Sequence, residues 1–343
     1  MAGLAAAAEA RRRGADVLLL EKGDRPGGSM LLSSGVVWRH ASFEAFRQEC
    51  PDGDPALQRL VFDRLDGDTE WLESLGAVVT ERGTGNERTA GVRFDTTSIK
   101  RALVDVAGEP RLGEPLTALP ADIPVVLATG GFPAGRELLR RHVTTEAEHL
   151  MLRAAPWSTG DGLRMGVEAG AETGGGLDQI YGRNMPAPPA RVDPGSFVRL
   201  SQLYARHATV ANSRGERYEA ATWSEIDVLQ WTARQPRARA WFTVDRGALG
   251  ERVRDRTVGE MIDAAEEAGA PVIREDSTVA VETVAGVTST LGGLRIDEDG
   301  RAAPGVYAAG TDAGGVATGG YASGLAAALV LGRVAAAAAL EDA

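Results

Sequence analysis

Cysteine and histidine are scarce in this chain of 343 residues, and their scarcity excludes several classes of site. Cys50 is the only cysteine, so the chain can hold no intrachain disulfide, C-x-x-C redox pair, iron–sulfur ligand set or haem attached through C-x-x-C-H. The four histidines are scattered and lack the spacing of metal ligands. The sequence therefore predicts a protein without a metal centre.

Positive charge and long apolar runs are also limited. The net charge is −11, and the acidic surface that it implies argues against a nucleic-acid partner. We expect no membrane span: residues 321–340 come nearest, but they include Arg333 and are rich in glycine and alanine, which favours a buried helix. Residues 1–10 lack the basic start of a signal peptide. We therefore expect a cytoplasmic protein with no membrane partner.

The first 22 residues have the pattern of the second half of a dinucleotide-binding βαβ unit. A small-residue helix over 3–14 precedes a strand over 15–22, and Glu21 near the strand's end could accept hydrogen bonds from a ribose hydroxyl. The alternative is an ordinary surface glutamate. Gly3 matches the third glycine of G-x-G-x-x-G, which allows close helix–strand packing. The first strand and the first two glycines are missing from this sequence.

Glycine-rich blocks then follow one another in a fixed order. They are Gly27-Gly28-Ser29, Ser33-Ser34-Gly35, Val125–Phe132, Ser158–Gly162, Thr290–Leu294, Gly305–Gly310 and Gly319–Leu325. In this order they resemble the FAD-binding flavoproteins of the fumarate reductase, succinate dehydrogenase and 3-ketosteroid dehydrogenase superfamily. The resemblance extends over essentially the whole chain, and within it the chain is identified as an amino-terminally truncated member.

The resemblance implies an α/β fold with a Rossmann-like FAD-binding domain formed from two chain segments and an inserted α+β cap domain. We expect the first FAD-binding segment at 1–176, the cap at 177–275 and the second FAD-binding segment at 276–343. Residues 43–75 are expected to be helical, because their apolar residues recur at helical spacing. Relatives usually carry a β-hairpin before the strand at 124–128, and most of it is expected to be deleted here.

The resemblance also implies that FAD is bound, and bound non-covalently, because residues 29–36 contain no histidine to which relatives attach the flavin. The helix that begins after Ser323 would direct its N-terminus at the flavin and stabilise the negative charge of the reduced state. Packing alone is the alternative for the glycines near residue 130. The positions assigned to FAD are Gly3, Glu21, Lys22, Gly27, Gly28, Ser29, Ser34, Gly35, Ala128, Thr129, Gly130, Asp161, Gly310, Thr311, Asp312, Ser323 and Leu325.

The substrate positions depart from those of fumarate reductases, which hold a dicarboxylate with two histidines and an arginine and protonate it with a second arginine. Tyr181 and Ser289 stand where the histidines would be, and Glu225 stands at the position of the proton-donor arginine by an ungapped count. The loop 314–323, which carries the other arginine in relatives, has none here. A buried dianion needs fixed positive partners, so we expect that fumarate and succinate are not substrates.

Three side chains are candidates for catalysis. Tyr321 resembles the tyrosine with which 3-ketosteroid dehydrogenases polarise a substrate carbonyl, although their Tyr-Pro-Gly context is absent. Tyr181 and Glu225 could transfer the proton. A structural role is the alternative for all three. His207 and the tryptophans are expected to pack in the cap.

The sequence therefore predicts an FAD-dependent oxidoreductase that acts on a CH–CH or C=C bond next to a carbonyl. Its substrate would be a small molecule, an apolar ketone or enone of steroid-like character, and its electron acceptor is left open. The second hypothesis is a truncated or decayed paralogue that binds FAD weakly or not at all. An NAD(P)-linked enzyme is disfavoured, because no second glycine fingerprint is found.

Overall fold

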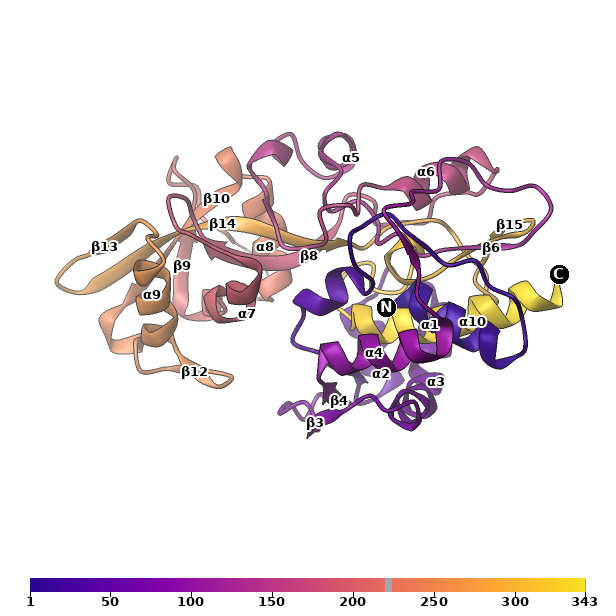
Figure 1. The fold of residues 1–343 in the computed structure, drawn as a ribbon. Helices are drawn as coiled ribbons and strands as arrows, with labels where there is room; N and C mark the ends of the chain where they lie inside the picture. Colours follow the sequence, from indigo (N-terminus) through magenta and orange to yellow (C-terminus); the bar gives the residue numbers. More distant parts are fainter. Residues whose placement is uncertain (220–223, 343) are drawn as a thin grey trace. The chain divides into compact units, whose positions relative to one another are not determined.

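The chain divides into two units, each assembled from separated segments, and the computed structural model describes residues 1–219 and 224–342 (Figure 1). The first unit comprises Met1–Gly135, Ala155–Gln179 and Thr290–Ala343, and the second comprises Arg136–Ala154 and Ile180–Ser289. The second unit therefore also includes 136–154 and 276–289, which the sequence had placed in FAD-binding segments. The domain boundaries drawn from the resemblance stay a prediction.

The first unit contains short parallel strands covered by long helices. Strand β1 (Leu20–Glu21) pairs in parallel with β5 (Arg111–Leu112), and β6 (Val125–Leu127) pairs in parallel with β16 (Val306–Ala308). Helix α1 (Ala2–Arg12) is buried along its alanines and packs against α4 (Thr96–Ala107) and α10 (Gly324–Glu341). Small side chains allow this close packing: the backbone oxygen of Ala2 would lie 2.6 Å from a Cβ on Gly332.

A buried charge network joins three of these helices. Arg333 of α10 donates to Glu9 of α1 at 2.9 Å and also to Asp68 of α3 (Pro55–Ser74).

By length and composition α10 is apolar enough to be a candidate membrane span, so the expectation that no segment is long and apolar enough is wrong. Its most apolar window is 67% buried, and a mostly buried core helix passes the same test.

The helix expected over 43–75 is two helices, which corrects the sequence prediction. Helix α2 (Phe43–Glu49) ends at Cys50, and α3 begins after Asp54, whose side chain accepts from the amides of Ala56 and Leu57. Pro51 and Gly53 lie between the two helices, and proline disfavours continuation of a helix. The remaining elements of this unit are η1 (Gly28–Leu32), β2 (Val36–His40), β3 (Val79–Arg82), β4 (Thr89–Phe94), α6 (Asp161–Glu168), β15 (Arg301–Ala303) and η7 (Gly310–Asp312).

The second unit is built on one long strand, β14 (Thr278–Thr290). The sequence predicts two strands here, over 279–284 and over 290–296, that return the chain to the FAD-binding domain. The first lies within β14, whose residues 278–289 belong to the second unit. The second is wrong, because residues 291–296 form only isolated bridges at Leu294. It pairs with the strands β7 (Met151–Leu152), β8 (Ile180–Pro186), β10 (Arg239–Asp245) and β13 (Val272–Arg274), and β9 (Ala208–Ala211) pairs with β10. The helices are α5 (Arg136–His142), α7 (Phe197–Leu200), α8 (Glu225–Ala233) and α9 (Val258–Glu267), and β11 (Arg252–Val253) pairs with β12 (Arg256–Thr257).

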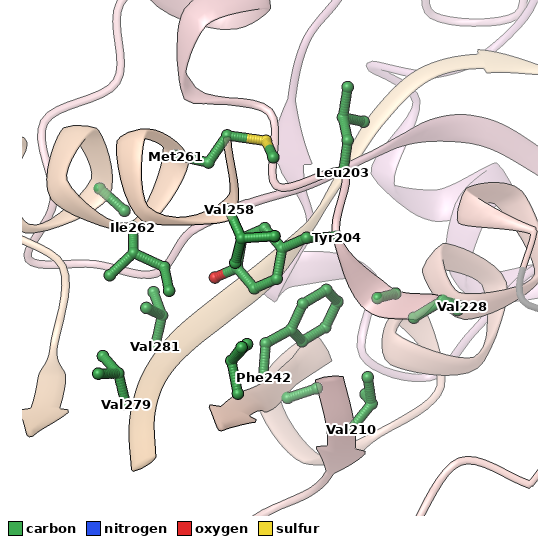
Figure 2. Close-up of a cluster of buried hydrophobic side chains, with 14 of the residues drawn as sticks. Leu203, Tyr204, Val210, Val228, Phe242, Val258, Met261, Ile262, Val279 and Val281 are labelled. Carbon is green, nitrogen blue, oxygen red and sulfur yellow. The ribbon is translucent and has the colours of Figure 1, made fainter. Parts of the chain in front are cut away.

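An apolar core fixes this unit around its sheet (Figure 2). Tyr204 and Phe242 are fully buried, with ring centroids 5.7 Å apart in an edge-to-face contact. Val279 and Val281 of β14 and Ile262 of α9 belong to the same cluster, as Figure 2 shows. The tertiary core therefore decides which polar side chains of this unit are buried.

Candidate functional site

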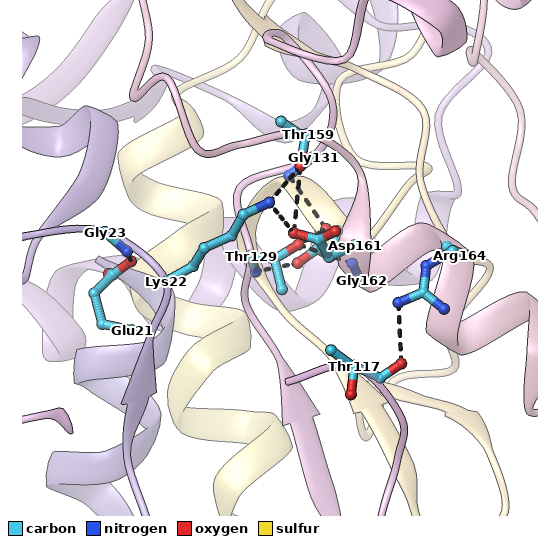
Figure 3. Close-up of polar contacts among 11 residues, drawn as sticks. Glu21, Lys22, Gly23, Thr117, Thr129, Gly131, Thr159, Asp161, Gly162 and Arg164 are labelled. Atoms are coloured by element: carbon cyan, nitrogen blue, oxygen red, sulfur yellow. Dashed lines mark hydrogen bonds and ion pairs between the residues drawn. The ribbon is translucent and has the colours of Figure 1, made fainter. Parts of the chain in front are cut away.

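The end of β1 carries the two charged residues that the sequence assigned to the cofactor. Glu21 Oε1 accepts from the amide of Gly23 at 2.8 Å, which fixes the carboxylate at the strand end (Figure 3). Lys22 donates to Thr159 Oγ1 at 2.7 Å and to Asp161 Oδ2 at 2.6 Å. Lys22 and Asp161 are therefore brought together and form an ion pair with each other.

Asp312 connects the end of β6 to η7. Its carboxylate accepts from the amide and hydroxyl of Thr129 and from the amide of Gly131, and the side chain is buried. Burial raises the pKa of Asp312 above its ordinary value, although these hydrogen bonds lower it. Thr129 Oγ1 in turn accepts from the amide of Gly162 at 3.0 Å. The geometry gives Asp312 a positioning role, and its contact with a cofactor stays a prediction.

Two glycines have open space beside them, at positions where the sequence predicts that the protein backbone contacts FAD. A Cβ on Gly28 or on Gly324 would have no other atom within 4 Å, and Gly28 has a φ of +55°. Gly324 is the first residue of α10, and the Oγ of the preceding Ser323 accepts from Ala326 at 3.2 Å. Unpaired N–H groups at such a helix start suit an electron-rich ring edge. Together with the carboxylate of Glu21, these residues fit FAD, and they would hold its ribose, pyrophosphate and flavin.

Other positions assigned to FAD are occupied by contacts within the chain. Ser29 Oγ accepts from the amide of Ala155 at 2.9 Å. A Cβ on Gly35 would lie 2.1 Å from the carbonyl oxygen of Phe94, so packing alone requires this glycine. Gly310 has a φ of +64°, which favours glycine, and a Cβ there would lie 3.0 Å from the Cβ of Ala2. Gly27, Gly130, Thr311 and Leu325 are half-buried or buried, Gly3 lies against Ala128, and Ser34 is exposed.

Tyr321 lies in a loop that is held from several sides. Its ring packs on Trp38 with centroids 5.3 Å apart, and its carbonyl oxygen lies 3.2 Å from His40 Nε2. Burial lowers the pKa of His40, and a neutral ring with its proton on Nε2 donates to that carbonyl. The side-chain Nε2 of Gln58 donates to the carbonyl of Val316 at 2.9 Å. Neutral groups thus fix the loop in which relatives carry an arginine.

The second unit brings the other two catalytic candidates close to one arginine. Arg183 lies over the ring of Tyr181, with its guanidinium carbon 4.9 Å from the ring centroid. Burial raises the pKa of Glu225 to about 7, and the charge of Arg183 is the largest influence that lowers it. Glu225 accepts a hydrogen bond from the backbone of Ala205, and its Oε2 atom is buried with no hydrogen-bond partner among the described residues. Arg183 therefore lies near both Tyr181 and Glu225.

Sequence reasoning missed three residues near these candidates. Trp38 and His40 hold Tyr321 and come from β2, far away in the sequence. Arg153 is buried in the second unit, directly after the short strand β7. An arginine immediately after an apolar run was the only local signal for it.

Comparison with known proteins gives two family matches. The FAD binding domain description matches residues 105–325, and the NAD(P)-binding Rossmann-like domain description matches residues 1–34. These matches confirm the mixed α/β class with a Rossmann-like FAD-binding domain, and FAD as cofactor.

Solved structures share the fold over nearly the whole chain. The open conformation of a flavocytochrome c3 fumarate reductase aligns with a TM-score of 0.73 at 20% identity, covering 99% of this chain and 76% of that one. A 3-ketosteroid-Δ4-(5α)-dehydrogenase from Rhodococcus jostii RHA1 aligns with a TM-score of 0.69 at 20% identity, covering 98% and 94%. A 3-ketosteroid Δ1-dehydrogenase from Sterolibacterium denitrificans aligns with a TM-score of 0.70 at 16% identity, covering 99% and 98%. The fold that the resemblance implies is confirmed.

Proposed function

This chain belongs to the FAD binding domain family, and from that premise we propose that it is an FAD-dependent oxidoreductase acting on a CH–CH or C=C bond next to a carbonyl. FAD, when bound, supplies hydride exchange at flavin N5. The protein's own residues must then bind the substrate, polarise its carbonyl and move one proton.

Glu225 carries the proposal, because it is a buried carboxyl group with a pKa of about 7. Such a group is half protonated near neutral pH, so it can give a proton to a substrate carbon or take one from it. Within the described part of the chain its buried Oε2 atom has no hydrogen-bond partner, so we assign the proton transfer to this oxygen. Arg183 lies close enough to influence this carboxyl, and its charge favours the ionised form. Tyr181 lies under the guanidinium of Arg183.

Tyr321 would polarise the carbonyl. Its backbone is fixed through His40 and its ring through Trp38, so the phenol has a defined position. A fixed O–H donor stabilises the negative charge that develops on a carbonyl oxygen during hydride and proton exchange. The loop that positions it precedes α10, whose N-terminus would face the flavin.

We propose an apolar ketone or enone of steroid-like character as the substrate, with a separate acceptor that reoxidises the flavin. The replacement of dicarboxylate-binding positions by Tyr181, Ser289 and Glu225 supports this choice over fumarate or succinate. Two of the similar structures were solved with 4-androstene-3,17-dione and with 1,4-androstadiene-3,17-dione. These ligands belong to those proteins and support the proposal by analogy of fold.

The test is single-turnover flavin kinetics with Glu225→Gln. The reduced, flavin-loaded protein is mixed with 2-cyclohexen-1-one under anaerobic conditions, and flavin absorbance is followed. General acid–base catalysis typically contributes about 10²- to 10⁴-fold, so we expect the variant to be slower by that range at unchanged flavin content. Glu267→Gln is the matched control, because this exposed glutamate of the same unit should not affect the rate.

Equal rates in the wild type and Glu225→Gln would remove Glu225 from the mechanism. A protein that takes up no flavin at all, even when titrated with FAD, would support the second hypothesis of an inactive paralogue.

A further inference from the structure

Arg153 is a buried cation without a countercharge. It is 8% exposed, and among the described residues no Asp or Glu forms an ion pair with it. Its Nε atom is buried, and no hydrogen-bond partner for it is found in the part of the chain that the structure describes. An unpaired buried charge is costly, and an unsatisfied buried donor calls for a missing partner such as an ion or water.

The contacts that Arg153 does make are long and neutral. Nη1 lies 3.2 Å from Thr288 Oγ1, and Nη2 lies 3.3 Å from Ser201 Oγ and 3.4 Å from the carbonyl oxygen of Phe197. Charge-assisted hydrogen bonds are usually about 2.7–2.9 Å long. The guanidinium also lies 5.3 Å from the centroid of the Phe197 ring. Hydroxyl groups, a carbonyl and an aromatic ring orient this cation without neutralising it.

The fold makes room for Arg153 on one face of the pair β8 and β14. A Cβ on Gly286 of β14 would lie 2.6 Å from Cδ of Arg153 and 2.8 Å from Cγ of Met185, so only glycine permits this placement. Side chains alternate along a strand, so Met185 shares its face of β8 with Arg183 and Tyr181. Both of these also act electrostatically on Arg153. Two guanidinium groups and a phenol ring therefore lie on one largely buried face.

We propose that Arg153, with Arg183 beside it, binds a carboxylate of the substrate. The substrate would then be a ketone or enone with an apolar body and one acid group. That the bound acid is the substrate of the reaction rests on the proposed function, whereas the anion site itself does not. Nε and Nη2 share the guanidinium edge that a planar carboxylate binds with two parallel hydrogen bonds. Burial strengthens that ion pair, because the local dielectric is low.

The test is equilibrium binding to the flavin-loaded full chain by isothermal titration calorimetry. The probes are cyclohexanecarboxylate and its uncharged analogue cyclohexanecarboxamide. We expect the carboxylate to bind at least about tenfold more tightly than the amide, which corresponds to about 1.4 kcal/mol. Arg153→Met should abolish this difference. Arg239→Met is the matched control, because Arg239 lies in the same unit but is already paired with Glu282 at 3.0 Å.

Equal affinities of the two probes for the wild type would overturn the proposal, and this comparison needs no variant to fold. A preference that survives Arg153→Met would overturn it as well, and tighter binding of inorganic sulfate would exclude a planar carboxylate as the natural partner. Because binding is measured without turnover, a failure of Glu225→Gln to slow flavin oxidation would leave this result intact.

Discussion

Thr129 donates its hydroxyl hydrogen to Asp312 Oδ1 at 3.0 Å, across 183 residues of sequence. The same carboxylate accepts from the amides of Thr129 and Gly131 and is 1% exposed. This contact joins the loop after β6 to the segment after β16, and so connects two of the three chain segments that form the first unit.

Asp312→Ala should destabilise the protein strongly. Removing the carboxylate leaves buried donors of Thr129 and Gly131 unsatisfied, and each costs about 1–3 kcal/mol. We expect a loss of about 3–5 kcal/mol in the free energy of unfolding, measured by urea denaturation. Asp299→Ala, at an exposed turn, is the control and should change it little. A loss below about 1 kcal/mol in the free energy of unfolding would mean that the hydrogen bonds of Asp312 are dispensable for stability.

Glu21→Ala should weaken FAD binding by about 1.5–3 kcal/mol, because a hydrogen bond to a charged group is lost. Riboflavin monophosphate lacks the adenosine ribose, so its affinity should not change. Titration of the flavin-free protein, followed by fluorescence quenching, measures both. Asp24→Ala, which changes a nearby exposed carboxylate, is the control. If both flavins responded equally, Glu21 would act through the fold and not through ribose.

Gly324→Ala should separate cofactor contact from stability. A methyl group has space there in the protein itself, and alanine is favoured over glycine in helices by about 1 kcal/mol. We expect unchanged or higher thermal stability of the flavin-free protein and weaker FAD affinity, because the methyl group would meet the flavin. Gly67→Ala in α3 also meets no atom within 4 Å and should leave FAD affinity unchanged. Equal FAD affinities in both variants would place the flavin elsewhere.

Tyr321→Phe should slow flavin reoxidation by an enone without loss of bound flavin. One oriented donor to a developing oxyanion is typically worth about 2.7–4 kcal/mol, or roughly 10²- to 10³-fold in rate. Rates are measured per flavin-loaded molecule, so that stability does not confound them. Tyr307→Phe is the control, since that hydroxyl bonds to Ala338 and Asp342 at the end of α10. Unchanged rates in Tyr321→Phe would make Tyr321 a packing residue.

The raised pKa of Glu225 predicts a pH-dependent stability. The folded pKa is about 7 against 4.5 for the free side chain, so between these values the folded state binds more protons than the unfolded state. Stability from this group is therefore present below pH 4.5 and falls as the pH rises to 7. Relative to Glu225→Gln, the wild type should lose about 3 kcal/mol between pH 4 and pH 8. Parallel stability curves for the two proteins would show that Glu225 is not desolvated.

Several elements followed from local pattern. The alanine-rich first helix, the strand that ends near Glu21 and the start of α10 after Ser323 were predicted, because helix caps and small-residue packing depend on neighbours in sequence. The break at Cys50–Asp54 was missed, since the apolar spacing continues through it although Pro51 and Asp54 mark the boundary. The strand predicted over 279–284 is part of β14, but its extension to Thr290 was missed, because the pairing partners of β14 come from distant segments.

The sequence by itself determined the family, the cofactor and which residue types stand at the positions where relatives bind dicarboxylates. Only the tertiary structure decided which charges are buried. Arg153 and Arg199 are the same residue type in the same unit, yet one lies under Phe197 against Gly286 and the other is exposed beside Glu267. The cost of burying a charge depends on atoms supplied by distant segments, and no local pattern records those atoms.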